Sequence, residues 1–217
     1  MGPSGIRSLC GLYLSICSIT IINLCGNLMP LLKESEWNAF WLGDTNIEWN
    51  VNAVDNNLVH YIEDCSNHPK TALEIGFGSG VNSYYMHRQG VQVDAIELSR
   101  SAVEKAIARY PGPSYKHESI LEPSNKKYNF IFDRAVYHMF IPDTLRDSFI
   151  QSVYNRMDSE STWLSIVILY GYKRFKDYNI QDAIKPLLPL FNVDYYLGTT
   201  ELTDGMEPCI IIRSKKK

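Results

Sequence analysis

The feature that most constrains the fold of this chain is a glycine-rich turn that follows a short apolar segment. Residues 71–75 have the pattern of a buried strand, and residues 76–80 read Gly-Phe-Gly-Ser-Gly. A helical pattern over 80–89 comes next and stops at Gly90. Glycines in such a turn allow tight backbone geometry and let a ligand come close to the main chain. This strand–loop–helix order predicts a ligand-binding loop at the carboxyl end of a strand.

The rest of the chain alternates between strand and helix patterns. Strand 162–169 is apolar on both faces, which is typical of the middle of a parallel sheet covered by helices. The alternation predicts an open, mostly parallel α/β sheet that binds ligands at the carboxyl ends of its strands. Further strands are expected at 91–97, 114–117, 128–133, 193–197 and 208–213, and further helices at 55–65, 101–110, 142–157 and 180–188.

Local signals mark some of the helix ends and faces. Asp55 is the expected N-cap of helix 55–65, and Ser101 with Glu104 has the spacing of a capping box. The side chains expected on the inner face of helix 142–157 are Leu145, Phe149 and Val153.

Residues 1–32 differ in character from the rest of the chain. Residues 9–32 hold no charged side chain, and a run of about 20 apolar residues can span a bilayer. Polar residues, glycines and a proline interrupt the run, and no signal-peptide cleavage site is evident. Three interpretations stay open: a membrane anchor or membrane-lying segment, a helix packed on the domain, or a segment upstream of a true start at Met29. Residues 33–217 are expected to form a single domain.

Composition narrows the class of protein. With 45% hydrophobic and 21% charged residues, the chain resembles an ordinary soluble protein, and its net charge of -3 gives no basic field for nucleic acid. The five cysteines are odd in number and lack metal-ligand spacing, which favours reduced thiols and no metal site. We expect a cytoplasmic protein, with membrane association possible through residues 9–32. Nothing in the sequence indicates the oligomeric state.

The glycine spacing discriminates between ligands. A dinucleotide-binding loop prefers G-x-G-x-x-G, but Val81 stands where its last glycine would be, so the pattern here is G-x-G-x-G. An acidic residue, Glu74, lies two positions before the first glycine. This resembles the first motif of class I S-adenosylmethionine-dependent methyltransferases. The resemblance implies S-adenosylmethionine as cofactor and a Rossmann-like methyltransferase fold: a three-layer sandwich with a seven-stranded, mostly parallel sheet whose last strand is antiparallel.

The resemblance also assigns cofactor roles. The glycine loop would pack on the amino-acid part of the cofactor, and Glu74 would help to hold its ammonium group. Glu97 ends a strand about 20 residues past the loop, where a carboxylate can accept hydrogen bonds from ribose hydroxyls. The alternative for Glu97 is a surface carboxylate beside a helix start. The expected cofactor-binding residues are Glu74, Gly76, Phe77, Gly78, Gly80, Glu97, Leu98, Ser119, Ile120, Asp133 and Trp41.

One position departs from the family pattern. The third strand of these enzymes often leads to an aspartate that binds the adenine amino group, whereas Ser119 occupies that place here and Ile120 follows it. A serine hydroxyl can still hydrogen-bond to adenine, but it brings no charge.

A third signal follows the strand 128–133. Asp133 ends this strand within the pattern D-R-x-x-x-H, which resembles the part of the family that lines the methyl-transfer site. Asp133, Tyr137 and His138 are therefore the candidate catalytic residues. A buried structural histidine is the alternative for His138. Arg134 could equally pair with a carboxylate or meet an anionic substrate.

Segment 34–50 contains Trp37, Trp41 and Trp49 and precedes the predicted core. It resembles the N-terminal lid of the thiopurine, thiol and halide methyltransferase branch, which folds over the cofactor. Aromatic walls attract a sulfonium cation and exclude water. The alternative is an amphipathic helix whose Trp37 and Trp41 only pack on the domain.

These resemblances imply methyl transfer from S-adenosylmethionine to a small-molecule acceptor, with a sulfur acceptor favoured because of the lid. The alternatives are transfer to oxygen or nitrogen, a protein-modifying methyltransferase, and a non-catalytic cofactor-binding or membrane-tethered protein. A nicotinamide dehydrogenase is disfavoured by the missing glycine and by Glu74.

Overall fold

The computed structural model describes residues 33–43, 51–66, 68–140, 144–168, 179–203 and 205–217. All of them belong to one compact unit, residues 31–217. Segment 1–32, with its three interpretations and its predicted membrane association, lies outside the described residues. Among the described helices, none has the length and apolar character needed to cross a bilayer.

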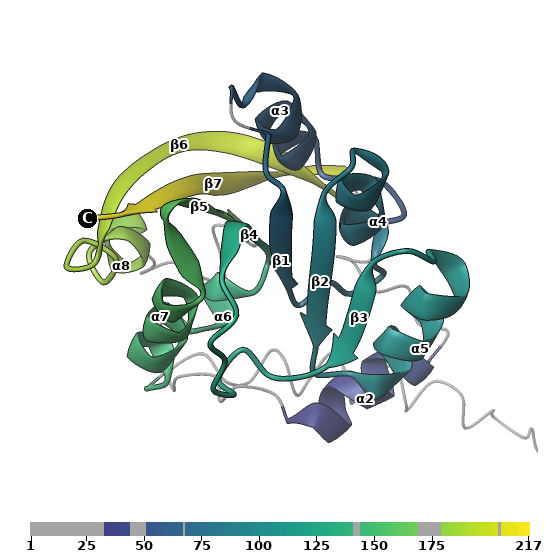
Figure 1. Ribbon diagram of the computed structural model, residues 1–217. Coiled ribbons are helices and arrows are strands. Elements are labelled where there is room, and N and C mark those ends of the chain that lie inside the picture. Colours follow the sequence, from purple (N-terminus) through teal and green to yellow (C-terminus); the bar gives the residue numbers. More distant parts are fainter. Residues whose placement is uncertain (1–32, 44–50, 67, 141–143, 169–178, 204) are drawn as a thin grey trace, which may run out of the picture. The chain divides into compact units, whose positions relative to one another are not determined.

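The described strands form one seven-stranded sheet in the order β3-β2-β1-β4-β5-β7-β6 (Figure 1). Strands β1 to β5 run parallel, and β7 is antiparallel to both of its neighbours. This confirms the predicted sheet, including the antiparallel last strand. The strands are β1 (Thr71–Ile75), β2 (Gln92–Glu97), β3 (Ser114–His117), β4 (Tyr128–Arg134), β5 (Met157–Ile168), β6 (Phe191–Leu202) and β7 (Gly205–Lys216).

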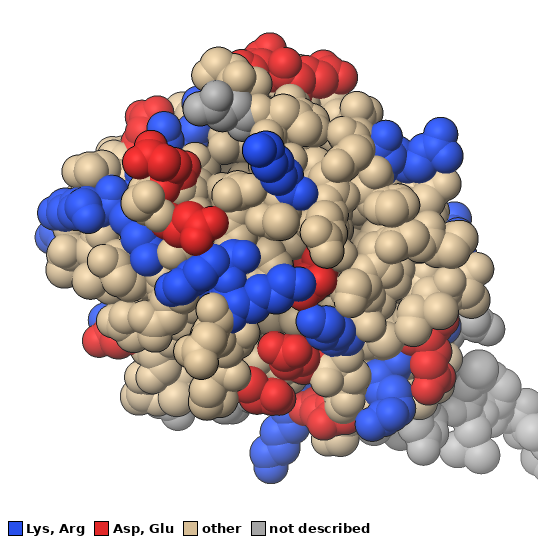
Figure 2. Space-filling view, in the orientation of Figure 1, with Lys and Arg blue, Asp and Glu red and all other residues tan. Residues whose placement is uncertain are grey.

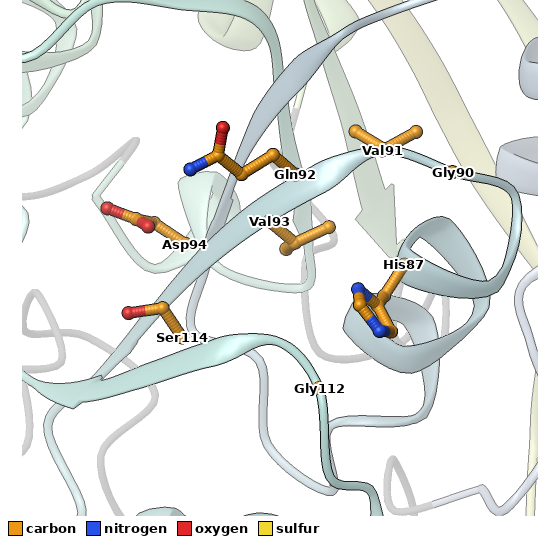
Figure 3. Close-up of a pocket in the computed structure, with 8 residues that line it drawn as sticks. All are labelled: His87, Gly90, Val91, Gln92, Val93, Asp94, Gly112 and Ser114. Atoms are coloured by element: carbon orange, nitrogen blue, oxygen red, sulfur yellow. The ribbon is translucent and has the colours of Figure 1, made fainter.

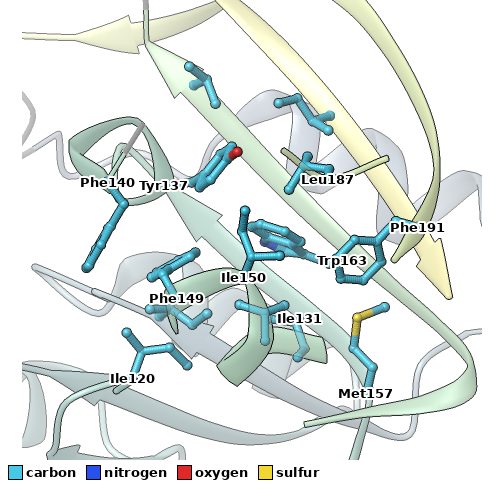
Figure 4. Packing of buried hydrophobic residues seen from close by; sticks show 14 of the residues in the cluster. Ile120, Ile131, Tyr137, Phe140, Phe149, Ile150, Met157, Trp163, Leu187 and Phe191 are labelled. Carbon is cyan, nitrogen blue, oxygen red and sulfur yellow. The ribbon is translucent and has the colours of Figure 1, made fainter. Parts of the chain in front are cut away.

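Helices cover both faces of the sheet, which gives the predicted three layers (Figure 1). They are α2 (Glu34–Leu42), α3 (Asn56–Asp64), α4 (Val81–Arg88), α5 (Arg100–Arg109), α6 (Tyr137–Phe140), α7 (Arg146–Asn155) and α8 (Ile180–Ile184). Successive strand residues point to opposite faces, so one core lies on each side. In β4, Phe130 and Phe132 pack with α3, α4 and α5, whereas Ile131 packs with α6, α7 and α8. Figure 4 shows the second core, in which Trp163 and Phe149 are fully buried.

Side-chain hydrogen bonds cap the N-termini of α3 and α5. Asp55 is the N-cap of α3, as predicted, because its Oδ1 accepts from the Asn57 N–H at 2.8 Å. The prediction of a capping box at Ser101 is wrong. Helix α5 is capped by Ser99, whose Oγ accepts from the Ala102 N–H at 3.3 Å.

The second half of the chain differs from the prediction in detail. The predicted helix 142–157 is represented by α7, with the separate short helix α6 before it. Phe149 and Val153 are buried as predicted, but Leu145 is 41% exposed because it is the N-cap of α7 and lies outside its packed turns. Strands β6 and β7 are longer than predicted because they pair as one continuous hairpin, in which backbone hydrogen bonds extend beyond the apolar residues.

Charged side chains are interspersed on the face shown in Figure 2. Lys and Arg lie next to Asp and Glu there, so this face offers no continuous basic surface.

Candidate functional site

The sheet topology brings three predicted elements to one edge. In the parallel register, Ile75 at the end of β1 pairs with Ile96 in β2 and with Asp133 in β4. The glycine turn after β1 therefore lies between Glu97 and the end of β4. The strand order reverses here, because β2 and β3 lie on one side of β1 and β4 lies on the other. Such a switch point is where open α/β sheets bind ligands.

The glycine turn needs its glycines for backbone geometry and for space. Gly76, Gly78 and Gly80 all have φ between +56° and +83°, a region that side chains disfavour. A Cβ at Gly78 would lie 3.2 Å from Cζ2 of the Trp41 indole. Gly78 is thus the turn residue that faces the segment predicted to be a lid.

Glu97 is tied directly to the glycine turn. Its Oε2 accepts from the Gly78 N–H at 3.2 Å, and its Oε1 accepts from the Ser99 N–H at 3.1 Å. The side chain is buried, and burial raises its pKa. Each carboxylate oxygen can accept more than one hydrogen bond, so Glu97 keeps capacity for the hydroxyls of a ribose. The alternative of a surface carboxylate does not describe this residue.

Glu74 is buried within β1 beside the same turn. The Ser83 hydroxyl donates to its carboxylate, and the side chain lines a small cavity with the glycine loop. Burial raises the pKa of Glu74 to about 8, and the nearby Glu97 acts in the same direction. A buried carboxyl of this kind fits a ligand ammonium group, because an adjacent positive charge favours the carboxylate.

The cavity at the glycine turn has a volume of about 50 Å³. Ligand pockets are commonly about 300–1,000 Å³, so residues that cover this cavity must move to admit a cofactor. Trp41, Val51 and Ala53 come from the N-terminal segment and are the obvious candidates for that movement. The cavity is lined by Trp41, Val51, Ala53, Glu74, Gly76, Phe77, Gly78, Ser79, Val81, Asn82 and Arg134.

A larger cavity of about 380 Å³ lies elsewhere, at the start of β2 (Figure 3). It is lined by His87, Gly90, Val91, Gln92, Val93, Asp94, Gly112 and Ser114. None of the residues predicted to bind cofactor or acceptor reaches it. We therefore place the candidate site at the smaller cavity, because five residues predicted to bind the cofactor line it: Trp41, Glu74, Gly76, Phe77 and Gly78.

The predicted lid forms helix α2, which packs against α5. Trp41 is buried, and the Lys105 ammonium group donates to its backbone carbonyl. Asn38 Oδ1 accepts from the Ser99 hydroxyl at 3.0 Å and from the Ser101 N–H at 3.2 Å. Helix α2 therefore lies against the turn that follows β2. Trp49 and the rest of segment 44–50 lie outside the described residues.

The predicted cofactor-binding residues Leu98, Ser119 and Ile120 follow the ends of β2 and β3. The Glu118 N–H donates to the Glu97 carbonyl at 3.1 Å, which keeps the two ends together. Ser119 is half-buried, and its hydroxyl accepts from the Leu121 N–H at 3.2 Å. Leu98 is half-buried, and Ile120 is buried in the core with α6 and α7.

The three predicted catalytic residues, Asp133, Tyr137 and His138, are not among the residues that line the cavity. Asp133 Oδ1 accepts from the Tyr137 N–H at 2.9 Å, and its Oδ2 accepts from Trp163 Nε1 at 2.9 Å. Burial raises the pKa of Asp133 to about 6. The Tyr137 hydroxyl donates to the Ala183 carbonyl at 2.8 Å within the core (Figure 4). Burial and then the charge of Arg134 lower the pKa of His138 to about 4.

An ion pair between Arg134 and Asp55 borders the cavity, and the sequence did not identify Asp55 as the partner. Arg134 Nε donates to Asp55 Oδ2 at 3.1 Å and to Thr200 Oγ1 at 3.0 Å, and Arg134 also lines the cavity. The Asp55 N–H donates to Asn82 Oδ1 at 3.0 Å. The sequence indicated a carboxylate partner for Arg134 as one option. It gave no sign that this partner is the helix cap Asp55.

Comparison with known proteins identifies one family and many solved structures with a similar fold. Residues 32–177 match the sequence model of a family described as Thiopurine S-methyltransferase (TPMT). No curated protein matches the chain.

Three solved structures illustrate the fold. One, from work on the conversion of a disulfide bond into a thioacetal group during echinomycin biosynthesis, has a TM-score of 0.71 at 14% identity, covering 85% of this chain and 91% of that chain. An S-adenosylmethionine-dependent methyltransferase from Anabaena variabilis has a TM-score of 0.66 at 17% identity, covering 85% and 95%. The N-methyltransferase NodS from Bradyrhizobium japonicum, in complex with S-adenosylhomocysteine, has a TM-score of 0.61 at 15% identity, covering 74% and 84%.

Proposed function

Because this chain belongs to the thiopurine S-methyltransferase family, and is therefore an S-adenosylmethionine-dependent methyltransferase, we propose that it methylates a sulfur atom of a small molecule. The observation that carries the sulfur preference is the family match, which spans both α2 and the glycine turn. A thiol suits this enzyme because a thiolate is a strong nucleophile that needs little base catalysis.

The candidate bases support an acceptor of that kind. Both carboxylate oxygens of Asp133 already accept hydrogen bonds from the protein, and the Tyr137 hydroxyl donates to a core carbonyl. His138 has a pKa of about 4, so it is a weak base at neutral pH. An alcohol or amine acceptor would require a stronger base at the cavity. We infer that Asp133 positions the turn after β4 and Trp163 and does not contact the acceptor.

Two buried carboxyl groups, those of Glu97 and Glu74, support a placement for the ribose and for the ammonium group of the cofactor. When bound, S-adenosylmethionine supplies a methyl group that its sulfonium activates. We propose that the Glu97 carboxylate holds the ribose hydroxyls and that Glu74 holds the ammonium group. Once Trp41 has moved aside, the turn at Gly78 would leave room for the amino-acid part, because glycine has no side chain to fill that space.

The lid would control access to this site. Trp41 lies over Gly78, so α2 must shift to admit the cofactor and can then return to cover it. Its indole would supply an aromatic wall for the sulfonium and exclude water from the reacting atoms.

Arg134 would favour an acceptor in its anionic form. Arg134 lines the cavity and carries a positively charged guanidinium group. A fixed positive charge lowers the pKa of a nearby thiol and increases its thiolate fraction. Asp55 and Thr200 hold the Arg134 side chain in place.

The test is methyl transfer from labelled S-adenosylmethionine to thiophenol, phenol and aniline, which differ only in the accepting atom. We expect methyl thioether from thiophenol and little product from the other two. Activity confined to phenol or aniline, or labelling of proteins in place of every small molecule, would refute the sulfur proposal. A reaction without acceptor is the control.

A further inference from the structure

A chain of hydrogen bonds joins the lid helix α2 to the glycine turn. Asn38 Oδ1 accepts from the Ser99 hydroxyl at 3.0 Å and from the Ser101 N–H at 3.2 Å. The Ser99 N–H donates to Glu97 Oε1 at 3.1 Å. The other oxygen of Glu97 accepts from the Gly78 N–H at 3.2 Å. A lid side chain is thus two hydrogen bonds away from the proposed ribose carboxylate.

Asn38 restrains the turn after β2 at two points. Ser99 is fully buried and caps α5 through its hydroxyl oxygen, while the same hydroxyl donates to Asn38. Ser101 lies in the first turn of α5, where backbone N–H groups have no partner within the helix. Asn38 supplies an acceptor for that N–H from outside the helix. Asn38 therefore contacts the same residue whose backbone N–H donates to Glu97.

Other contacts of α2 hold the helix by different routes. The Lys105 ammonium group donates to the Trp41 carbonyl, and Glu34 Oε1 lies 3.0 Å from His117 Nε2. Neither contact involves Ser99. A substitution at Asn38 can therefore separate the positioning of Glu97 from the attachment of the helix as a whole.

We propose that Asn38 is a positioning residue for the cofactor. Acting through Ser99, it holds the Glu97 carboxylate in the orientation that the ribose requires, and it couples this orientation to the closed position of α2. Side chains that support a binding group from behind commonly set how well that group binds. This inference rests on the proposed placement of the ribose at Glu97.

The test exploits the fact that Asn38 acts as an acceptor in these bonds. Asn38→Asp keeps an acceptor oxygen in place, whereas Asn38→Ala removes it. We expect Asn38→Ala to raise the Kd for S-adenosylhomocysteine about tenfold, the effect of about 1.4 kcal/mol of lost hydrogen bonding. Asn38→Asp should stay close to the original protein. Ser35→Ala, at an exposed position of the same helix, is the matched control and should leave the Kd unchanged.

Kinetics with thiophenol as acceptor then distinguish positioning from general damage. Asn38→Ala should raise KM for S-adenosylmethionine while kcat at saturating cofactor stays within about twofold, as expected for lost binding alone. Alanine favours helix more than asparagine, so the fold of α2 should persist. Should Asn38→Ala nevertheless lower Tm, Asn38→Gln, which displaces the amide by one methylene, provides the same test.

A double-mutant cycle identifies the route. If Asn38 acts through Glu97, Asn38→Ala should change the Kd little further in a Glu97→Ala background. Equal effects in both backgrounds, or no effect of Asn38→Ala alone, would overturn the inference. An unchanged Kd in Glu97→Ala by itself would instead refute the ribose placement, so the two failures are distinguishable.

Discussion

The Gly78 N–H donates to Glu97 Oε2 at 3.2 Å and so joins the turn after β1 to the end of β2. The parallel register of the two strands brings these residues together, although they are far apart in the chain. A ligand that contacts the glycine turn is therefore within reach of the carboxylate. Substitutions at either residue should affect the same binding event.

Gly78→Val should greatly weaken cofactor binding. The new side chain would meet the Trp41 indole and fill the space that the cofactor needs. We expect the Kd for S-adenosylhomocysteine to rise by about 100-fold or more, equivalent to about 2.7 kcal/mol, measured by calorimetry.

Gly90→Val is the matched control for that substitution. Gly90 also has positive φ, but a Cβ there would meet nothing within 4 Å. Both variants should lose about 1–3 kcal/mol of stability from backbone strain. Only Gly78→Val should lose binding, and equal affinities in the two variants would contradict the site.

Glu97→Ala should weaken binding of S-adenosylhomocysteine by about 1.5–3 kcal/mol, because hydrogen bonds to a charged group are lost. Glu104→Ala removes an exposed carboxylate from α5, the helix that follows the same strand, and should leave the Kd unchanged. Thermal unfolding of both variants checks that the loss is not general destabilisation. Matching Kd values for Glu97→Ala and the original protein would argue against ribose binding here.

Cofactor affinity should increase with pH. Burial raises the pKa of Glu74 to about 8, so this carboxyl keeps its proton at neutral pH in the protein alone. A ligand ammonium group favours the carboxylate, so binding releases a proton. The Kd for S-adenosylhomocysteine should fall up to about tenfold per pH unit below pH 8 and level off above it.

Glu74→Gln is the control for this pH dependence. In this variant the Kd for S-adenosylhomocysteine should change little between pH 7 and 8. In the protein without ligand, the neutral Glu74 contributes stability that is complete below its unfolded pKa of 4.5 and is lost as pH rises through about 8. Between pH 4.5 and about 8, Tm should therefore decline less steeply in Glu74→Gln than in the original protein. An affinity that falls with pH, or identical slopes in both proteins, would exclude Glu74 as the linked group.

Asp55→Asn should destabilise the protein by about 3–5 kcal/mol, because the Arg134 charge would remain buried without its counterion. The two side chains are 1% and 11% exposed, and asparagine can still cap α3. The control is Asp147→Asn, which removes an ion pair of the same 3.1 Å length in which Asp147 is 83% exposed. Asp147→Asn should lower the free energy of unfolding, measured with denaturant, by no more than about 1 kcal/mol. Equal losses of unfolding free energy in the two variants would mean that burial does not strengthen the Asp55–Arg134 ion pair.

Much of the fold was predictable because its signals are local. Alternating strand and helix patterns predicted the sheet, and the five residues 76–80 predicted the glycine turn after β1. Asp55 was recognisable as a cap from its position before α3. The ends of β6 and β7 were not predictable, because pairing between strands extends them past their apolar residues.

The candidate site was also only partly predictable from the sequence. Neighbouring residues of a strand point to opposite faces, and the sequence did not reveal which face of β4 borders the cavity. Asp133 turned out to bond Trp163 inside one core, whereas the adjacent Arg134 lines the cavity on the other side. Distant partners were equally hidden, since Thr200 and Asp55 meet Arg134 only after the sheet has formed.

The sequence by itself determined the α/β sheet, the glycine turn and the carboxylate that ends β2, because backbone geometry and periodic burial are encoded over a few residues. Only the tertiary structure decided that Asn38 reaches Ser99, that Trp41 covers Gly78 and that Asp55 pairs with Arg134. Those contacts join segments that are distant in the chain, and they depend on packing between whole elements that no local pattern specifies.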